Sequence, residues 1–108
     1  MTPTEFVECI AREKDELLAM AMDPNSGSAA AEHIAALDLN SDQINHLKNA
    51  IDGLLTDAYY SFLLGLDGAG SLGGQQRDYE LKDEDGSLLT KGELEGPAWE
   101  RFHGDAID

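Results

Sequence analysis

The sequence has few basic residues, one cysteine and no long apolar run. Seven Lys and Arg residues stand against 22 Asp and Glu residues, which gives a formal net charge of −15. Because proteins bind phosphate groups through Lys and Arg, we expect no direct binding to nucleic acid. Anionic membrane surfaces are disfavoured for the same reason, and no apolar run approaches the ~18 residues that cross a bilayer. A basic protein partner, in contrast, would be attracted to this chain.

The lone cysteine, Cys9, has no second cysteine with which to form an internal disulfide. We therefore expect a cytoplasmic protein, because thiols stay reduced in that compartment. Cys9 lies beside the apolar stripe of a predicted first helix, so we expect a partly buried side chain. The three histidines, His33, His46 and His103, share no metal-ligand spacing with it. The sequence thus predicts no transition-metal site.

The length of 108 residues, of which 42% are hydrophobic, fits one small domain with a modest core. We expect a single domain over 1–108 in the α+β class. Its predicted parts are antiparallel helices over about 3–66, including one long central helix, a glycine hinge over 65–74, and a small β-hairpin with a short terminal helix over 77–104.

Two capping boxes mark the expected starts of helices. Thr2 with Glu5, and Asn40 with Gln43, have the spacing at which side chain and backbone cap each other. Apolar residues then recur at steps of three and four between positions 44 and 66, which predicts a helix of about 25 residues. The alanine-rich stretch 28–38 favours a short helix by propensity. Its few large apolar residues leave a weakly held segment as the alternative.

The predicted hairpin depends on a change of period after the glycines. Tyr79 and Leu81 alternate with polar residues, and the stretch 84–86 ends in Gly86, which can adopt a positive φ in a tight turn. Pro97 then favours a final helical turn that closes at Gly104.

Gly68, Gly70 and Gly73 have the G-x-G-x-x-G spacing of a dinucleotide-binding loop. That loop follows a strand and opens a helix, whose N-terminus holds the phosphates. Here a long predicted helix precedes the glycines and a strand-like stretch follows them. We therefore interpret the motif as a helix end and a hinge, and expect no nucleotide cofactor.

Calcium is the other ligand that an acidic chain suggests. Asp38, Asn40 and Asp42 match the first, third and fifth positions of an EF-hand loop, but Gln43 stands where glycine is required and Asn49 where glutamate is required. The helix cap explains these residues without a metal. We also find no spacing typical of a catalytic nucleophile or general base, and expect no enzyme activity.

The remaining signal is acidic surface. Ten acidic and three basic residues lie between Asp78 and Asp108. The candidate partner-binding residues are Asp78, Glu80, Asp83, Glu84, Asp85, Glu93 and Glu95. We expect a small acidic, non-enzymatic interaction protein that binds and neutralises or regulates a basic protein. Immunity proteins and antitoxins are similar in size and charge alone.

The alternative is a self-associating helical subunit, a homodimer formed through the long helix. Five residues, Tyr59, Tyr60, Phe62, Leu63 and Leu64, offer more apolar surface than one helix face can bury. In that case the acidic surface serves solubility. Trp99 and Phe102 also have two interpretations, either as anchors for a partner or as residues that pack the hairpin onto the long helix.

Overall fold

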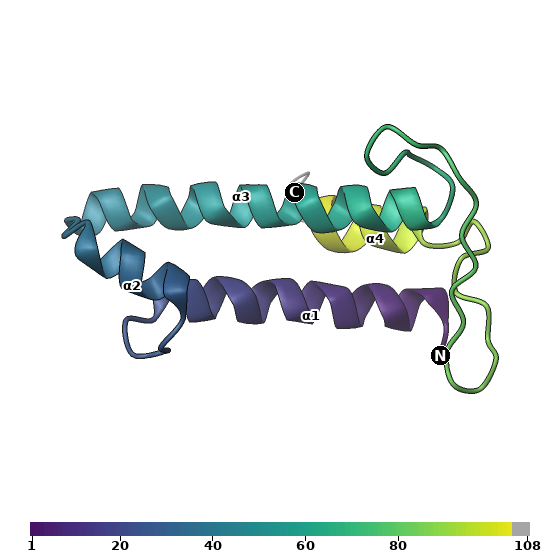
Figure 1. Cartoon of the computed structure of the whole chain (residues 1–108), viewed down its shortest axis with the longest axis horizontal. Helices are drawn as coiled ribbons and strands as arrows, with labels where there is room; N and C mark the ends of the chain where they lie inside the picture. The colour runs from purple at the N-terminus through teal and green to yellow at the C-terminus, as the bar shows by residue number, and fades with distance from the viewer. Residues whose placement is uncertain (105–108) are drawn as a thin grey trace.

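The computed structural model describes residues 1–104, which form four helices joined by loops. These are α1 (Pro3–Met22), α2 (Ala29–Ala36), α3 (Ser41–Leu66) and α4 (Glu95–His103). The long helices α1 and α3 lie side by side and antiparallel, α2 connects them at one end, and α4 packs on both near the other end (Figure 1). Within residues 1–104, no helix has the length and apolar composition to cross a membrane.

The starts of the first three helices are fixed by local side chains. Thr2 with Glu5, and Asn40 with Gln43, both form the capping boxes that the sequence predicts. Ser28 caps α2 by accepting a hydrogen bond from the amide of Ala31. The predicted long helix is confirmed, and so is a helix within the alanine-rich stretch.

The hydrophobic core lies at one end of the molecule, where α1, α3 and α4 meet. Its buried members are Val7, Leu63, Leu94 and Ala98, and four partly buried residues, Phe6, Ile10, Tyr60 and Phe102, pack against them. Farther along the α1–α3 pair, Lys14 of α1 forms an ion pair with Asp52 of α3. The packing that holds the fold together is therefore concentrated at the end that carries α4.

The predicted α+β class is wrong, because residues 1–104 contain no β-strand and no hairpin of paired strands. The segment between α3 and α4 is a loop with two isolated bridges, Leu72–Gln75 and Lys82–Leu88. A turn does form before Gly86, which has φ 83°. Beyond it, the hydroxyl of Thr90 bonds the backbone of Tyr79 and Leu81 in place of a second strand.

Burial of two leucines accounts for the path of this loop. Leu89 and Leu94 are buried, and Leu94 belongs to the helical core beside Leu63. A two-stranded hairpin alone is marginally stable in water. The chain therefore follows the path that buries these leucines, and the alternation in the sequence does not determine that path.

The glycine segment begins inside α3, not after it. Gly65 is helical and buried, the helix ends at Leu66, and Gly68 takes a left-handed conformation at φ 80°. Asp67 then accepts hydrogen bonds from the amides of Gly92 and Leu94 at 2.8 and 2.9 Å. The end of α3 is thereby joined to the start of α4, and no helix begins between Gly68 and Glu95.

Candidate functional site

Three aromatic rings join α4 to α3 at the surface. They belong to Tyr60 of α3 and to Trp99 and His103 of α4, and we call them the aromatic cluster. The ring of Tyr60 lies edge-on to His103 with centroids 4.6 Å apart, and Trp99 lies 4.8 Å from His103 and 6.1 Å from Tyr60. Trp99 remains 47% exposed, whereas Phe102 packs against the core. Phe102 therefore contributes to the core, whereas the ring of Trp99 remains accessible at the surface.

Negative charge accompanies the aromatic cluster. Glu95 precedes Trp99 by four residues, so both lie on the same side of α4. Burial raises the pKa of Tyr60, and the nearby charge of Glu95 raises this pKa further. The phenol therefore stays neutral at physiological pH. Aromatic faces next to a carboxylate form a surface that favours a Lys or Arg side chain.

Asp83, one of the predicted partner-binding residues, has its carboxylate bonded to other groups of the same chain. Its carboxylate accepts hydrogen bonds from the Met1 ammonium group at 2.7 Å and from the amides of Asp85 and Ser87 at 3.0 and 2.9 Å. The bond from the ammonium group is the main cause of the lowered pKa of Asp83. Asp83 therefore shapes the loop, and its charge is already neutralised.

The other predicted residues fall into separate groups. Four loop residues, Asp78, Glu80, Glu84 and Asp85, are exposed. Their carboxylates make no hydrogen bond or ion pair with any residue in the range 1–104. Glu93 lies 3.8 Å from Lys91, and Glu95 begins α4 beside the aromatic cluster. The predicted hairpin is absent from residues 1–104, so these residues are spread along the loop and the start of α4.

Asp78 and Glu80 line a cleft of about 310 Å³ between the loop and the end of α3. Tyr79 and Lys91 also contribute to its walls. These two carboxylates therefore flank a recess, while Glu84 and Asp85 lie at the tip of the turn.

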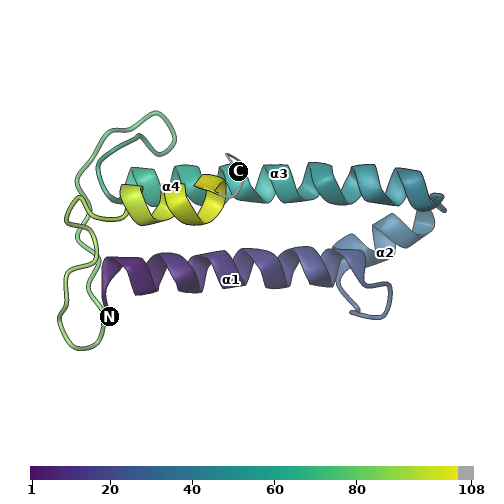
Figure 2. The ribbon, with the colours of Figure 1, turned by 180° about the vertical axis from the view of Figure 1, so that it is seen from behind.

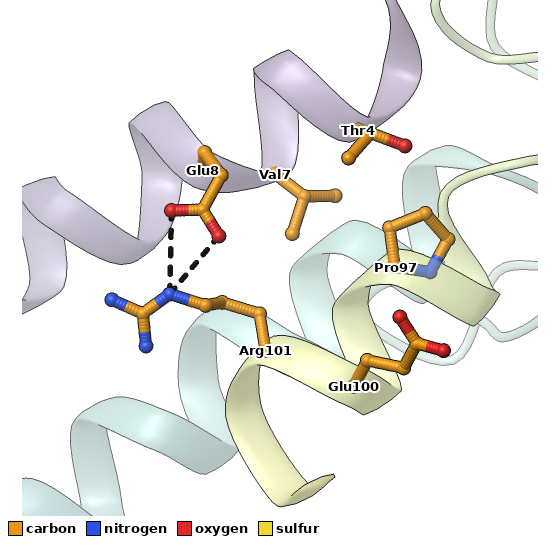
Figure 3. A pocket seen from close by; sticks show the side chains of 6 residues that line it. All are labelled: Thr4, Val7, Glu8, Pro97, Glu100 and Arg101. Atoms are coloured by element: carbon orange, nitrogen blue, oxygen red, sulfur yellow. Dashed lines mark hydrogen bonds and ion pairs between the residues drawn. The ribbon is translucent and has the colours of Figure 1, made fainter.

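A second cleft, of about 240 Å³, lies between α1 and α4 (Figure 3). Val7 and Pro97 form its apolar side, and Arg101 is the cation in its wall. Arg101 is paired with Glu8 at 3.1 Å and with Asp15 at 3.2 Å. The guanidinium thus clamps α4 onto α1 and is not free to bind an anion.

Two further features of residues 1–104 are the possible metal ligands and the single cysteine, Cys9. No group of three or more His, Cys, Asp or Glu side chains within residues 1–104 is arranged to hold a metal ion. Cys9 is exposed, which corrects the expectation of a partly buried thiol. Its sulfur accepts a contact from Arg12 Nη2 at 3.7 Å.

Comparison with protein-family models, curated proteins and solved structures gives no match. The functional argument therefore rests on the residues and geometry of this chain.

Part of the aromatic cluster was within reach of the sequence. Glu95, Trp99 and His103 recur every four residues, a spacing that places them on one side of a helix. Tyr60 could not be added to them, because it is 39 positions away from Trp99 along the chain and only packing of α4 against α3 brings the rings together.

Proposed function

We propose that this chain is a non-enzymatic binding protein that engages a basic protein partner through the aromatic cluster and Glu95. The observation that carries the proposal is the exposure of Trp99, the only tryptophan, within a cluster of three aromatic rings. The carboxylate of Glu95 lies beside it and has no ion-pair partner within residues 1–104. Tryptophan is enriched among the residues that dominate binding energy at protein interfaces. By occupying a basic surface of its partner, the protein would neutralise or regulate that partner.

Electrostatics supports the choice of partner. With a net charge of −15, the molecule speeds its encounter with a cationic surface and repels acidic ones. The exposed loop residues Asp78, Glu80, Glu84 and Asp85 add to this field near the same end of the molecule. We place the encounter in the cytoplasm, on the ground that the single exposed thiol of Cys9 persists in a reducing compartment.

The test compares partner capture by four forms of the protein at low and at high salt. We expect the wild type to retain one basic protein from lysate of the source cells, and to lose it as salt screens the charges. Trp99→Ala is expected to weaken binding to that purified protein by about 30-fold or more, equivalent to ~2 kcal/mol. Glu95→Lys is expected to weaken binding as well, because it places a lysine against the basic surface of the partner.

The matched control is Glu32→Lys, which makes the same change in net charge on α2, at the opposite end of the molecule. This variant should bind nearly as well as the wild type. Equal losses in Glu95→Lys and Glu32→Lys would show that only net charge matters, and unchanged binding by Trp99→Ala would contradict the proposed site. Retention of no basic protein by the wild type would overturn the proposal as a whole.

A further inference from the structure

A second apolar surface runs along the long helix α3. Five residues spaced by four, three, four and four positions form one stripe, which we call the α3 stripe: Leu47, Ile51, Leu54, Ala58 and Phe62. Leu54 is 70% exposed and Phe62 is 46% exposed. Ala58 is exposed between them, whereas Leu47 and Ile51 are half-buried. The part of the stripe without a packing partner within residues 1–104 therefore runs from Leu54 to Phe62.

The α3 stripe faces away from the aromatic cluster. Phe62 follows Tyr60 by two residues, and two residues of an α-helix turn the chain by about 200°. Since Tyr60 contacts Trp99 and His103 of α4, Phe62 points to the opposite side. The two views of the ribbon agree with this, because α4 lies on one side of the α1–α3 pair (Figures 1 and 2).

The chain itself places a leucine on the end of this stripe. Gly65, three residues after Phe62, lies directly under the side chain of Leu72 from the following loop. A Cβ at Gly65 would meet two carbon atoms of Leu72 at 2.5 Å, so the absence of a side chain creates the seat. Leu72 thus covers the turn of α3 that follows the stripe, and the exposed residues Leu54 and Phe62 before it have no such cover within residues 1–104.

One exposed carboxylate of α1, that of Glu13, lies on the same side of the molecule as this face. Lys14 faces α3 through its ion pair with Asp52, and the next residue, Asp15, pairs with Arg101 of α4. Glu13, the residue before Lys14, is therefore turned to the side of α1 away from α4. It is exposed and forms no ion pair with residues 1–104. The uncovered face is therefore apolar along α3, with one free carboxylate on its α1 side.

We propose that the α3 stripe is a docking surface for one amphipathic helix of a partner protein, with leucine-like residues on its apolar side and Lys or Arg beside them. Charge decides between this occupant and a second copy of the chain. Two copies would bring together bodies that each carry a net charge of −15, and these bodies would repel each other. A basic helix is instead attracted by that charge, and it can place a cation beside Glu13 while its apolar side covers Leu54 and Phe62. The surface is distinct from the aromatic cluster, so the inference goes beyond the function proposed above.

The experiment measures binding of a 14-residue peptide made of leucine and lysine, with leucines at helical spacing on one side. The reporter is a fluorophore attached to the single exposed thiol, Cys9. A peptide of the same composition, with its order scrambled to remove the apolar side, has the same charge. We expect the patterned peptide to bind at least tenfold more tightly than the scrambled one, and to become helical on binding.

Leu54→Gln should weaken binding of the patterned peptide by about tenfold. Its matched control is Leu37→Gln, at a residue that is 58% exposed on the end of α2, which should change binding little. Both sites are exposed, so both variants should keep the wild-type helix content by circular dichroism. Equal binding of the two peptides, or equal effects of the two variants, would overturn the proposal. A wild-type dimer in sedimentation equilibrium that Leu54→Gln dissociates would also overturn it, in favour of a second copy as the occupant.

Discussion

Asp83 shows how the surroundings of one residue decide what its charge can do. Its carboxylate holds the Met1 ammonium group and two amides of the turn that follows. Trp99 is the opposite case, since its ring remains half exposed although neighbouring aromatics contact it. The carboxylate of Asp83 is bonded within the molecule, whereas the ring of Trp99 stays accessible to solvent.

Asp83 should make the loop sensitive to acid. Its pKa is lowered in the folded protein, chiefly by the bond from the Met1 ammonium group. The contribution of this charge is therefore fully present above the ordinary carboxyl pKa of 3.8 and is lost as the pH falls through the lower pKa of the folded protein. The amide signal of Ser87 in NMR spectra should shift over that range.

The Met1 ammonium group predicts a second change, at alkaline pH. Its pKa is raised above 8.0 by the hydrogen bond to Asp83, so its contribution is complete below pH 8.0 and is lost as the pH rises through the higher folded value. In Asp83→Asn the amide oxygen can still accept from the turn, but both pH responses of Ser87 should disappear. An unchanged pH profile in this variant would show that another group causes it.

At the scale of elements, the end of α3 is the joint on which the fold depends. Asp67 is a carboxylate at a helix C-terminus, where the helix dipole disfavours negative charge. Its two hydrogen bonds, from the amides of Gly92 and Leu94, offset that cost. They also bring Leu94 into the core, so this one side chain links a long loop to the packing of α4.

Asp67→Ala should lower the free energy of unfolding by about 1–3 kcal/mol, because two amides lose a charged acceptor. Urea denaturation followed by circular dichroism measures the change. Asp57→Ala, on the same helix and at an exposed position without a partner in residues 1–104, should change stability by less than about 0.5 kcal/mol. A similar change in both variants would mean that the joint does not depend on Asp67.

At the scale of the whole molecule, a core located at one end has to hold together a chain of strongly negative charge. The elongated shape extends 46 Å along its longest axis, which separates some of the 22 carboxylates. Within residues 1–104, the ion pairs of Arg101, Lys14 and Lys91 use three of the seven basic side chains. Most of the acidic charge is therefore balanced only by solvent ions.

Sodium chloride should stabilise the fold for this reason. Raising it from 20 to 300 mM shortens the screening length, which weakens repulsion among carboxylates more than it weakens the few ion pairs. We expect Tm to rise by several degrees, since about 1 kcal/mol corresponds to ~4–8 °C in a domain of this size. A fall in Tm with salt, measured by differential scanning calorimetry, would instead show that the ion pairs of Arg101 outweigh the repulsion.

The sequence by itself determined the local structure. The capping side chains at Thr2 and Asn40, and the periodic apolar residues between 44 and 66, act within a few residues of the elements they define. The starts of α1 and α3 and the long helix were predictable because these interactions need no distant partner. The start of α4 was not, since α4 begins at Glu95, two residues before Pro97, and no side chain caps it. The net charge could also be obtained from the sequence, since it is a sum over the residues of the chain.

Only the tertiary structure decided where the loop after α3 goes and which side chains remain free. The alternation at Tyr79 and Leu81 is compatible with a strand, but the path is set by burial of Leu89 and by burial of Leu94 in the helical core. In the same way, distant contacts neutralise Asp83 and bring Tyr60 to Trp99. Such choices depend on competition between burial sites far apart in sequence, which local pattern does not record.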